Sequence, residues 1–347
     1  MRRHYLLTFL CITLLASCGS TAGPAPSDVQ SSENASSSQS ASSAIKAKEI
    51  TIRRMPDKMD YYSGDFFDST GMIVDAVTID GHILNNVAFR VLTKEAVTKE
   101  NKSIAITFGG LVEQFDVNVT SSGNKEEYSV ASTPVIENSP LQGKSFLFLG
   151  SSVTYGEKSF GESIPDFLAK RHQCVCVKEA VSGTTLMDKT TSAGKSYVAR
   201  LEDYLGKADR ASFLDGFVLQ LSTNDISYRD QWGSVTSDEE KDASKFNKQT
   251  TIGAMEYIFA TIAETYHCPL YLFSNSRYND YYGELVGLAI PAAAKWNATF
   301  INLHDDAAFN NITQEQHERY MDDIVHPSRC GYRDWWLPKF EEALTAK

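Results

Sequence analysis

The stretch that decides the fold is Phe146-Leu147-Phe148-Leu149-Gly150-Ser151-Ser152-Val153-Thr154-Tyr155-Gly156. Its first four residues are apolar without interruption, which is typical of a strand buried on both faces of a sheet. Ser152 follows this strand, and ligands of open α/β sheets bind just beyond the carboxyl ends of the strands. The hydroxyl of Ser152 is therefore a candidate nucleophile, although serine also favours the position that caps a helix.

Strands and helices alternate over residues 143–347. This alternation indicates a parallel sheet covered by helices on both faces. Five short apolar runs predict strands, at residues 146–149, 174–177, 217–221, 270–273 and 300–303. Helical patterns lie between or after them, at residues 164–171, 197–205, 252–266, 281–296 and 332–344. The carboxyl edge of this α/β sheet is where we expect a site.

Residues suited to a catalytic site follow three of these strands. Gly183 comes after the second strand, where a glycine lets the backbone approach a ligand closely. Asn224 comes after the third. Asp323 and His326 come after the fifth and are three residues apart. A turn would let the carboxylate accept a hydrogen bond from the imidazole Nδ1–H and leave Nε2 free to take a proton from a serine.

Together these segments resemble the SGNH, or GDSL-like, hydrolase family over most of residues 143–347. The resemblance implies a flavodoxin-like fold and catalysis by Ser152, Asp323 and His326 through an acyl-serine intermediate. It also implies an oxyanion hole made by the N–H groups of Ser152 and Gly183 and by the amide of Asn224. No cofactor is expected for this chemistry.

Two positions depart from the family pattern, and some alternatives stay open. Ser151 stands where the family usually has aspartate, and Ser222 where it has glycine, but neither position transfers a proton or holds the oxyanion. Ser151 is also a rival nucleophile, Asp322 is a rival partner for the base, and Asn224 is a possible helix cap. Further histidines compete for the role of base, namely His172, His267, His304 and His317.

The N-terminus has the pattern of an export signal. Residues 1–17 combine Arg2 and Arg3 with a short apolar run and small residues, and the run is too short to cross a bilayer. Residues 15–18 resemble a bacterial lipobox, which implies that cleavage leaves Cys18 as a lipid-modified N-terminus. The lipid would anchor the protein to a membrane outside the cytoplasm. Residues 18–45 are rich in serine and poor in large apolar residues, so they predict a flexible tether.

Residues 46–120 have the pattern of a small all-β domain. Short β-type runs are separated by turn signals such as Asp80-Gly81, which predicts an antiparallel sandwich. Its strand and turn spacing resembles the bacterial immunoglobulin-like domains of surface proteins, which act as spacers or adhesive modules. Residues 121–142 are polar and contain two prolines, and they are interpreted as a linker.

The charge and the cysteine content bear on nucleic-acid binding, metal binding and disulfide formation. The net charge is −11 and there is no cluster of lysine and arginine, so nucleic acid is not an expected partner. His172, Cys174 and Cys176 would alternate on one strand face, but no second cluster with zinc-like spacing completes a site, and no metal is expected. We expect small buried thiols, and the sequence leaves open whether a disulfide forms among Cys174, Cys176, Cys268 and Cys330.

These observations predict a lipid-anchored serine hydrolase that acts on esters. Anchoring at the surface and a preceding β-domain favour a polymeric substrate, so the first interpretation is an esterase that removes short acetyl groups from carbohydrate, for example from an acylated polysaccharide. A lipolytic esterase is the second interpretation. A surface adhesin that has lost activity is the third.

Overall fold

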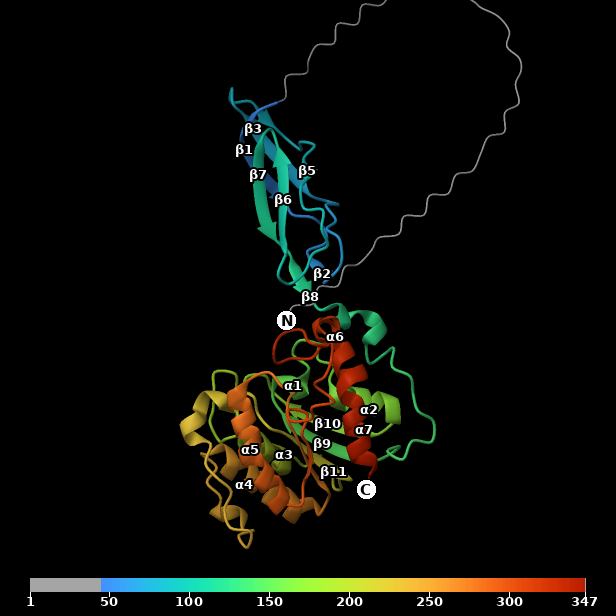
Figure 1. Ribbon diagram of the computed structural model, residues 1–347, viewed down its shortest axis with the longest axis vertical. Helices are drawn as coiled ribbons and strands as arrows, with labels where there is room; N and C mark the ends of the chain where they lie inside the picture. Colours follow the sequence, from blue (N-terminus) through green and yellow to red (C-terminus); the bar gives the residue numbers. More distant parts are fainter. Residues whose placement is uncertain (1–44, 347) are drawn as a thin grey trace, which may run out of the picture. The chain divides into compact units, whose positions relative to one another are not determined.

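The computed structural model describes residues 45–346. The predicted signal peptide 1–17, the predicted lipidation site Cys18 and the predicted tether up to residue 44 lie outside this range. Ile45–Lys347 forms one compact unit, with strands in its N-terminal part and alternating strands and helices in its C-terminal part (Figure 1). Within residues 45–346, no helix combines the length and the hydropathy that a bilayer span requires.

The C-terminal part is built on a five-stranded parallel sheet in the order β10-β9-β11-β12-β13. Its strands are β9 (Ser145–Gly150), β10 (Val175–Ala180), β11 (Gly216–Gln220), β12 (Leu270–Phe273) and β13 (Thr299–Ile301). This arrangement confirms the predicted five-stranded sheet and has the flavodoxin-like order. The chain runs from β9 outward to β10 and returns to β11 on the other side of β9. The carboxyl ends of β9 and β11 therefore flank the switch point, where such folds bind ligands.

Helices cover both faces of this sheet (Figure 1). One face carries α3 (Tyr197–Gly206), α4 (Thr251–Tyr266) and α5 (Asp280–Lys295). The other carries α2 (Ile164–His172), the π-helical segment η5 (Gly331–Trp336) and α7 (Leu337–Thr345). The predicted continuous helix at 332–344 is therefore a π-helical turn followed by an α-helix.

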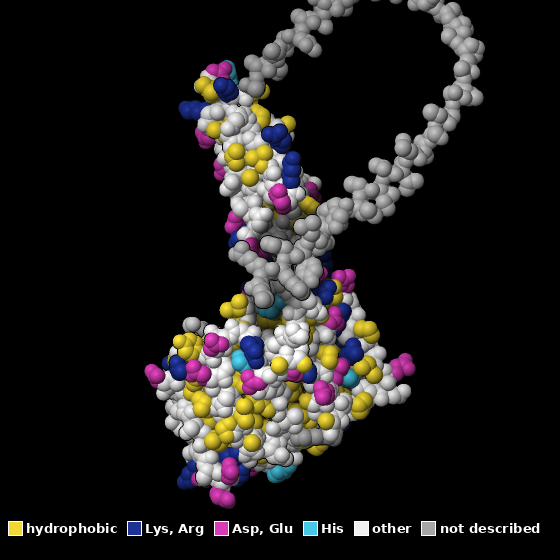
Figure 2. Space-filling model, viewed as in Figure 1, with side chains coloured by type: hydrophobic (Ala, Val, Ile, Leu, Met, Phe, Trp, Pro, Cys, Tyr) yellow, Lys and Arg dark blue, Asp and Glu magenta, His cyan; other side chains and the backbone are white. Residues whose placement is uncertain are grey.

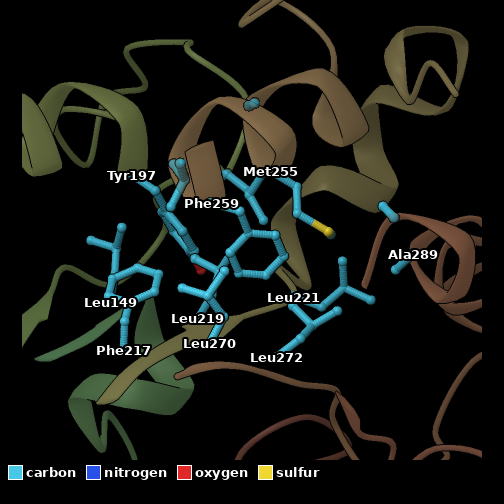
Figure 3. Packing of buried hydrophobic residues seen from close by; sticks show 14 of the residues in the cluster. Leu149, Tyr197, Phe217, Leu219, Leu221, Met255, Phe259, Leu270, Leu272 and Ala289 are labelled. Carbon is cyan, nitrogen blue, oxygen red and sulfur yellow. The ribbon is translucent and has the colours of Figure 1, made fainter. Parts of the chain in front are cut away.

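The central strand β9 contributes to both hydrophobic cores. Leu147 and Leu149 pack toward α3 and α4, whereas Phe146 and Phe148 pack on the opposite face. Figure 3 shows the first of these cores, in which Leu149 lies near side chains of β11 and of the helices above it. Because successive side chains of a strand point to opposite faces, burial on both sides explains the uninterrupted apolar run.

Short helical segments complete the C-terminal part and the segment that leads into it from β8. They are η1 (Ser122–Asn124), η2 (Glu126–Tyr128), α1 (Ser152–Tyr155), η3 (Asn224–Gln231), η4 (Ala243–Lys245) and α6 (Gln314–Tyr320). No side chain of α6 is fully buried. Apolar periodicity could not have revealed this helix, since it has no buried apolar stripe.

The N-terminal part contains only strands. They are β1 (Ala47–Arg54), β2 (Asp60–Tyr62), β3 (Ile73–Thr78), β4 (Ile83–Leu84), β5 (Arg90–Val91), β6 (Ser103–Phe108), β7 (Leu111–Asp116) and β8 (Asn118–Thr120). Sheets β1-β3-β4 and β5-β6-β7 are antiparallel and enclose Val74, Ile104 and Ile106. The pair β2-β8 is parallel, unlike the purely antiparallel expectation, because its strands lie far apart in sequence and no hairpin joins them. The immunoglobulin-like assignment stays a prediction.

The segment after β8 packs on the C-terminal part. The Ser121 hydroxyl donates hydrogen bonds to the carbonyl oxygens of Glu318 (2.8 Å) and Arg319 (3.0 Å). A Cβ at Gly123 would lie 1.9 Å from the Arg319 carbonyl oxygen, so a glycine is required where η1 meets the end of α6. The predicted linker therefore begins with residues that are held against the C-terminal part.

His172 is not on a strand, which corrects one expectation. It is the last residue of α2, because Gln173 adopts the left-handed conformation (φ 55°) and ends the helix before β10 begins. Its Nδ1 lies 2.6 Å from the Ser139 hydroxyl. The thiols of Cys174 and Cys176 are 3.6 Å apart and unoxidised. Within residues 45–346, no cluster of three or more histidine, cysteine or acidic side chains could hold a metal ion.

Acidic and basic side chains are interspersed over the face of the molecule shown in Figure 2. A nucleic-acid-binding face would instead gather lysine and arginine side chains in one patch. That nucleic acid is not a partner stays a prediction.

Candidate active site

The turn after β9 is fixed by a buried glutamine at the end of β11. The Oε1 atom of Gln220 accepts hydrogen bonds from the backbone N–H of Ser151 (2.9 Å) and from the backbone N–H and hydroxyl of Thr154 (3.1 and 2.7 Å). A Cβ at Gly150 would lie 1.9 Å from the Thr154 hydroxyl, so only glycine fits there. Ser152 begins α1 at this turn and is 6% exposed. The position of its hydroxyl is therefore set by two neighbouring strands.

The loop between α6 and η5 brings a histidine to this hydroxyl. The Nε2 atom of His326 lies 2.8 Å from Ser152 Oγ. Its Nδ1 lies 2.9 and 2.8 Å from the two carboxylate oxygens of Asp323. The loop is closed by a hydrogen bond from the Asp322 N–H to the His326 carbonyl oxygen (2.8 Å). Carboxylate, imidazole and hydroxyl thus form one line of hydrogen bonds.

The carboxylate of Asp323 is ionised in this arrangement. Burial would raise its pKa, but hydrogen bonds from the His326 ring and from the backbone N–H groups of Val325 and His326 lower the pKa to about 2. The negative charge is therefore retained wherever the pH is well above 2. It can hold the Nδ1–H tautomer of the imidazole and stabilise the imidazolium form.

The predicted oxyanion donors lie on adjacent turns. Gly183 has φ 76°, and a Cβ there would lie 2.8 Å from the Cβ of Ala193, so the turn requires glycine. The side-chain amide of Asn224 donates a hydrogen bond to the carbonyl oxygen of Thr184, the residue after Gly183, at 2.8 Å. Since an amide carries two N–H groups, one remains for a substrate oxygen. That Ser152, Gly183 and Asn224 form the oxyanion hole stays a prediction.

The hydrogen bonds around Asn224 show whether its side chain acts as a helix cap. The Ser222 hydroxyl accepts a hydrogen bond from the Asn224 backbone N–H (3.2 Å), and the Asn224 side chain points to Thr184 rather than to η3. Asp225 is buried and accepts from the N–H groups of Leu186 (2.8 Å) and Met187 (3.1 Å), and burial raises its pKa. The side chains of Asn224 and Asp225 therefore do not cap η3.

Replacing Asn224 by alanine tests its role as an oxyanion donor. We expect the kcat for a chromogenic acetyl ester to fall by about 100- to 1,000-fold, the loss that follows removal of one such donor. Thermal unfolding of the variant separates this effect from the loss of the hydrogen bond to Thr184. A folded variant with less than a tenfold loss would show that Asn224 only supports the turn.

The rival candidates have other partners. The Ser151 hydroxyl is buried and accepts a hydrogen bond from Gln220 Nε2 (3.3 Å). The Asp322 carboxylate accepts from the Thr120 hydroxyl (2.7 Å) and the Ser121 N–H (2.8 Å). Among the histidines of residues 45–346, His326 alone is hydrogen-bonded to the Ser152 hydroxyl. The geometry therefore favours Ser152, Asp323 and His326 over the alternatives.

Three side chains that the sequence did not single out hold this site in place. Gln220 fixes the nucleophile turn. Asn275, two residues beyond the end of β12, donates from Nδ2 to the Val325 carbonyl oxygen (2.8 Å) and so holds the loop of His326. Arg200 is buried, which lowers its pKa, and donates to the Gly150 carbonyl oxygen (2.6 Å). Only Gln220 carried a usable signal, as the polar last residue of a buried apolar strand.

The model of the GDSL-like Lipase/Acylhydrolase family matches residues 148–333. The chain belongs to this family. The match includes the five residues predicted for catalysis and the oxyanion hole, and it identifies the protein as a serine hydrolase that acts on ester bonds. No curated protein sequence matches the chain.

Several solved structures are similar to part of this chain. A member of the lipolytic protein G-D-S-L family from Veillonella parvula has 14% identity and a TM-score of 0.42, with 59% of this chain and 100% of that chain covered. A protein from Lactobacillus plantarum has 16% identity and a TM-score of 0.43, with 58% of this chain and 96% of that chain covered. An inhibitor-bound aryl esterase from M. smegmatis has 14% identity and a TM-score of 0.40, with 58% and 97% covered.

Proposed function

We propose that the protein is a surface-anchored esterase that removes short acyl groups, acetyl above all, from carbohydrate. The observation that carries the catalytic part is the 2.8 Å contact between His326 Nε2 and Ser152 Oγ, with the Asp323 carboxylate on the other ring nitrogen. Nucleophile and base at hydrogen-bond distance, with the base oriented by a third group, are the arrangement that covalent acyl transfer needs.

The reaction would proceed in two similar steps. Ser152 Oγ attacks the ester carbonyl carbon while His326 Nε2 takes the hydroxyl proton, and the negative carbonyl oxygen is held by the N–H donors of Ser152, Gly183 and Asn224. The bond to the alcohol then breaks, and His326 returns the proton to the alcohol oxygen. Water attacks the acyl-serine in the same way and releases the acid.

Polar side chains next to the nucleophile support a short acyl group. Glu157 and Lys158 follow α1 and are exposed. The Glu157 carboxylate accepts a hydrogen bond from the hydroxyl of Ser182, the residue before Gly183. A long acyl chain would need extended apolar walls, because burying it against charged groups removes their hydration.

A series of acyl-chain lengths separates the candidate activities. We expect kcat/KM for p-nitrophenyl esters to be highest for acetate and to fall through butyrate and octanoate to palmitate, and acetate to be released from acetylated oligosaccharides. Rising values toward octanoate and palmitate would instead support a lipolytic esterase. The remaining alternative, an adhesin without activity, requires that no ester in the series be hydrolysed.

The anchoring proposal rests on the sequence around Cys18. Replacing Cys18 by alanine removes the thiol that would carry the lipid, so we expect the protein to move from the membrane fraction to the soluble extracytoplasmic fraction. Immunoblots of the separated fractions measure this directly. A variant that stays in the membrane fraction would refute lipid attachment at Cys18.

A further inference from the structure

A cleft of about 380 Å³ lies between the β-domain and the loop that follows the nucleophile. One wall is the parallel pair β2-β8, which contributes Tyr62 and Asn118, and the opposite wall is formed by Glu157, Lys158 and Phe160. The volume falls within the range of small-molecule sites, about 300 to 1,000 Å³.

The cleft is connected to the catalytic residues by short covalent and hydrogen-bonded links. The Glu157 N–H donates to the Ser152 carbonyl oxygen (3.1 Å), so the cleft wall begins one helical turn beyond the nucleophile. Asp322, another lining residue, precedes Asp323 in the chain and forms an ion pair with Lys99 of the β-domain (3.2 Å). The cleft is therefore lined by the two segments that carry the catalytic residues, but not by those residues themselves.

Phe160 occupies this wall at a conformational cost. Its φ is 57°, a left-handed conformation that a bulky residue rarely adopts, and the residue is 62% exposed. The neighbouring Ser159 is buried and donates to the carbonyl oxygens of Gly156 and Glu162, which holds the loop in this shape. The guanidinium group of Arg329 lies 4.8 Å from the centroid of the Phe160 ring and covers part of it. Strain at an aromatic residue that is still largely exposed points to a binding role for the uncovered part of the ring.

The lining has the chemistry of a saccharide site. The rings of Tyr62 and Phe160 offer apolar faces for the C–H faces of a sugar, and the side chains of Asp60, Asn118 and Glu157 offer hydrogen-bond partners for hydroxyl groups. The lining contains three carboxylates, those of Asp60, Glu157 and Asp322, and one ammonium group, that of Lys158. Because Lys99 offsets the charge of Asp322, two carboxylates remain against one ammonium group, and this net negative charge disfavours uronic acids and the phosphate groups of phospholipids.

We propose that this cleft binds neutral sugar units next to the acetylated unit of an oligosaccharide, so that the β-domain supplies one wall of the substrate site. The inference rests on the proposed carbohydrate esterase function. It gives the β-domain a part in substrate selection, beyond the predicted role of spacer.

The test compares two substrates in the full chain. Phe160→Gly removes the ring and relaxes the backbone, and we expect the ratio of kcat/KM for acetylated xylo-oligosaccharide to that for p-nitrophenyl acetate to fall about tenfold or more. Phe160→Tyr keeps an aromatic face and should retain the ratio. The matched control is Phe66→Ala, since Phe66 is an equally exposed phenylalanine (69%) of the β-domain outside the cleft lining.

Three results would overturn the proposal. They are an unchanged ratio in Phe160→Gly, an equal fall in Phe66→Ala, and a preference of the unaltered protein for acetylated oligogalacturonide over acetylated xylo-oligosaccharide. Binding is measured separately, by calorimetry of Ser152→Ala with deacetylated xylo-oligosaccharide. Binding that Phe160→Gly abolishes supports the cleft even if no acetylated sugar is hydrolysed, in which case the proposed function fails and the cleft stands.

Discussion

Replacing Ser152 by alanine should abolish turnover of p-nitrophenyl acetate, with a loss on the order of 10⁴- to 10⁶-fold. The variant keeps the base, its carboxylate and the turn held by Gln220, but it has no atom to form the acyl intermediate. Its fold should be preserved, because the Ser152 side chain is hydrogen-bonded to His326 and to no other described residue. Initial rates and thermal unfolding of both proteins measure the two effects.

Ser151→Ala is the matched control for this experiment. The Ser151 hydroxyl accepts a hydrogen bond from Gln220 Nε2 (3.3 Å) and interacts with the Tyr197 side chain, while the hydrogen bonds that fix the turn come from backbone N–H groups and from Thr154. We therefore expect a loss of no more than about tenfold, in line with one neutral hydrogen bond. A larger loss in Ser151→Ala than in Ser152→Ala would transfer the role of nucleophile to Ser151.

Replacing Asp323 by asparagine should reduce kcat by about 10⁴-fold with little change in KM. The asparagine carbonyl can still accept from the backbone N–H groups of Val325 and His326, so the loop should keep its shape. Its amide can donate to Nδ1, however, which favours the tautomer with the proton on Nε2. That tautomer cannot accept the proton of Ser152.

Asp322→Asn separates this effect from a general loss of charge in the loop. The Asp322 carboxylate faces Lys99, Thr120 and Ser121, away from the imidazole. We expect its replacement to lower kcat far less than Asp323→Asn does. Equal losses in the two variants would show that Asp323 does not act through the tautomer of His326.

The sequence predicted the parts of this molecule that depend on local pattern. The apolar run before Gly150 predicted β9, and the three-residue spacing of Asp323 and His326 anticipated their hydrogen bond. Such features could be predicted because residue type and short spacing determine them directly. The roles of these residues in catalysis stay predictions until the variants are measured.

Contacts between distant segments could not be predicted in this way. Gln220 reaches the nucleophile turn, and Asn275 reaches the loop of His326, only because the sheet order brings those segments together. The ends of helices were also hard to predict from the sequence. The left-handed Gln173 ends α2 after His172, and no strong breaker residue in the sequence marks that point.

The most direct test of the account is mass spectrometry of the protein after reaction with a fluorophosphonate. We predict one covalent adduct, located on the peptide that contains Ser152, and loss of that adduct when His326 is replaced by alanine. An adduct on another serine, or an equally fast adduct on Ser152 without His326, would contradict the proposal that this imidazole activates this hydroxyl.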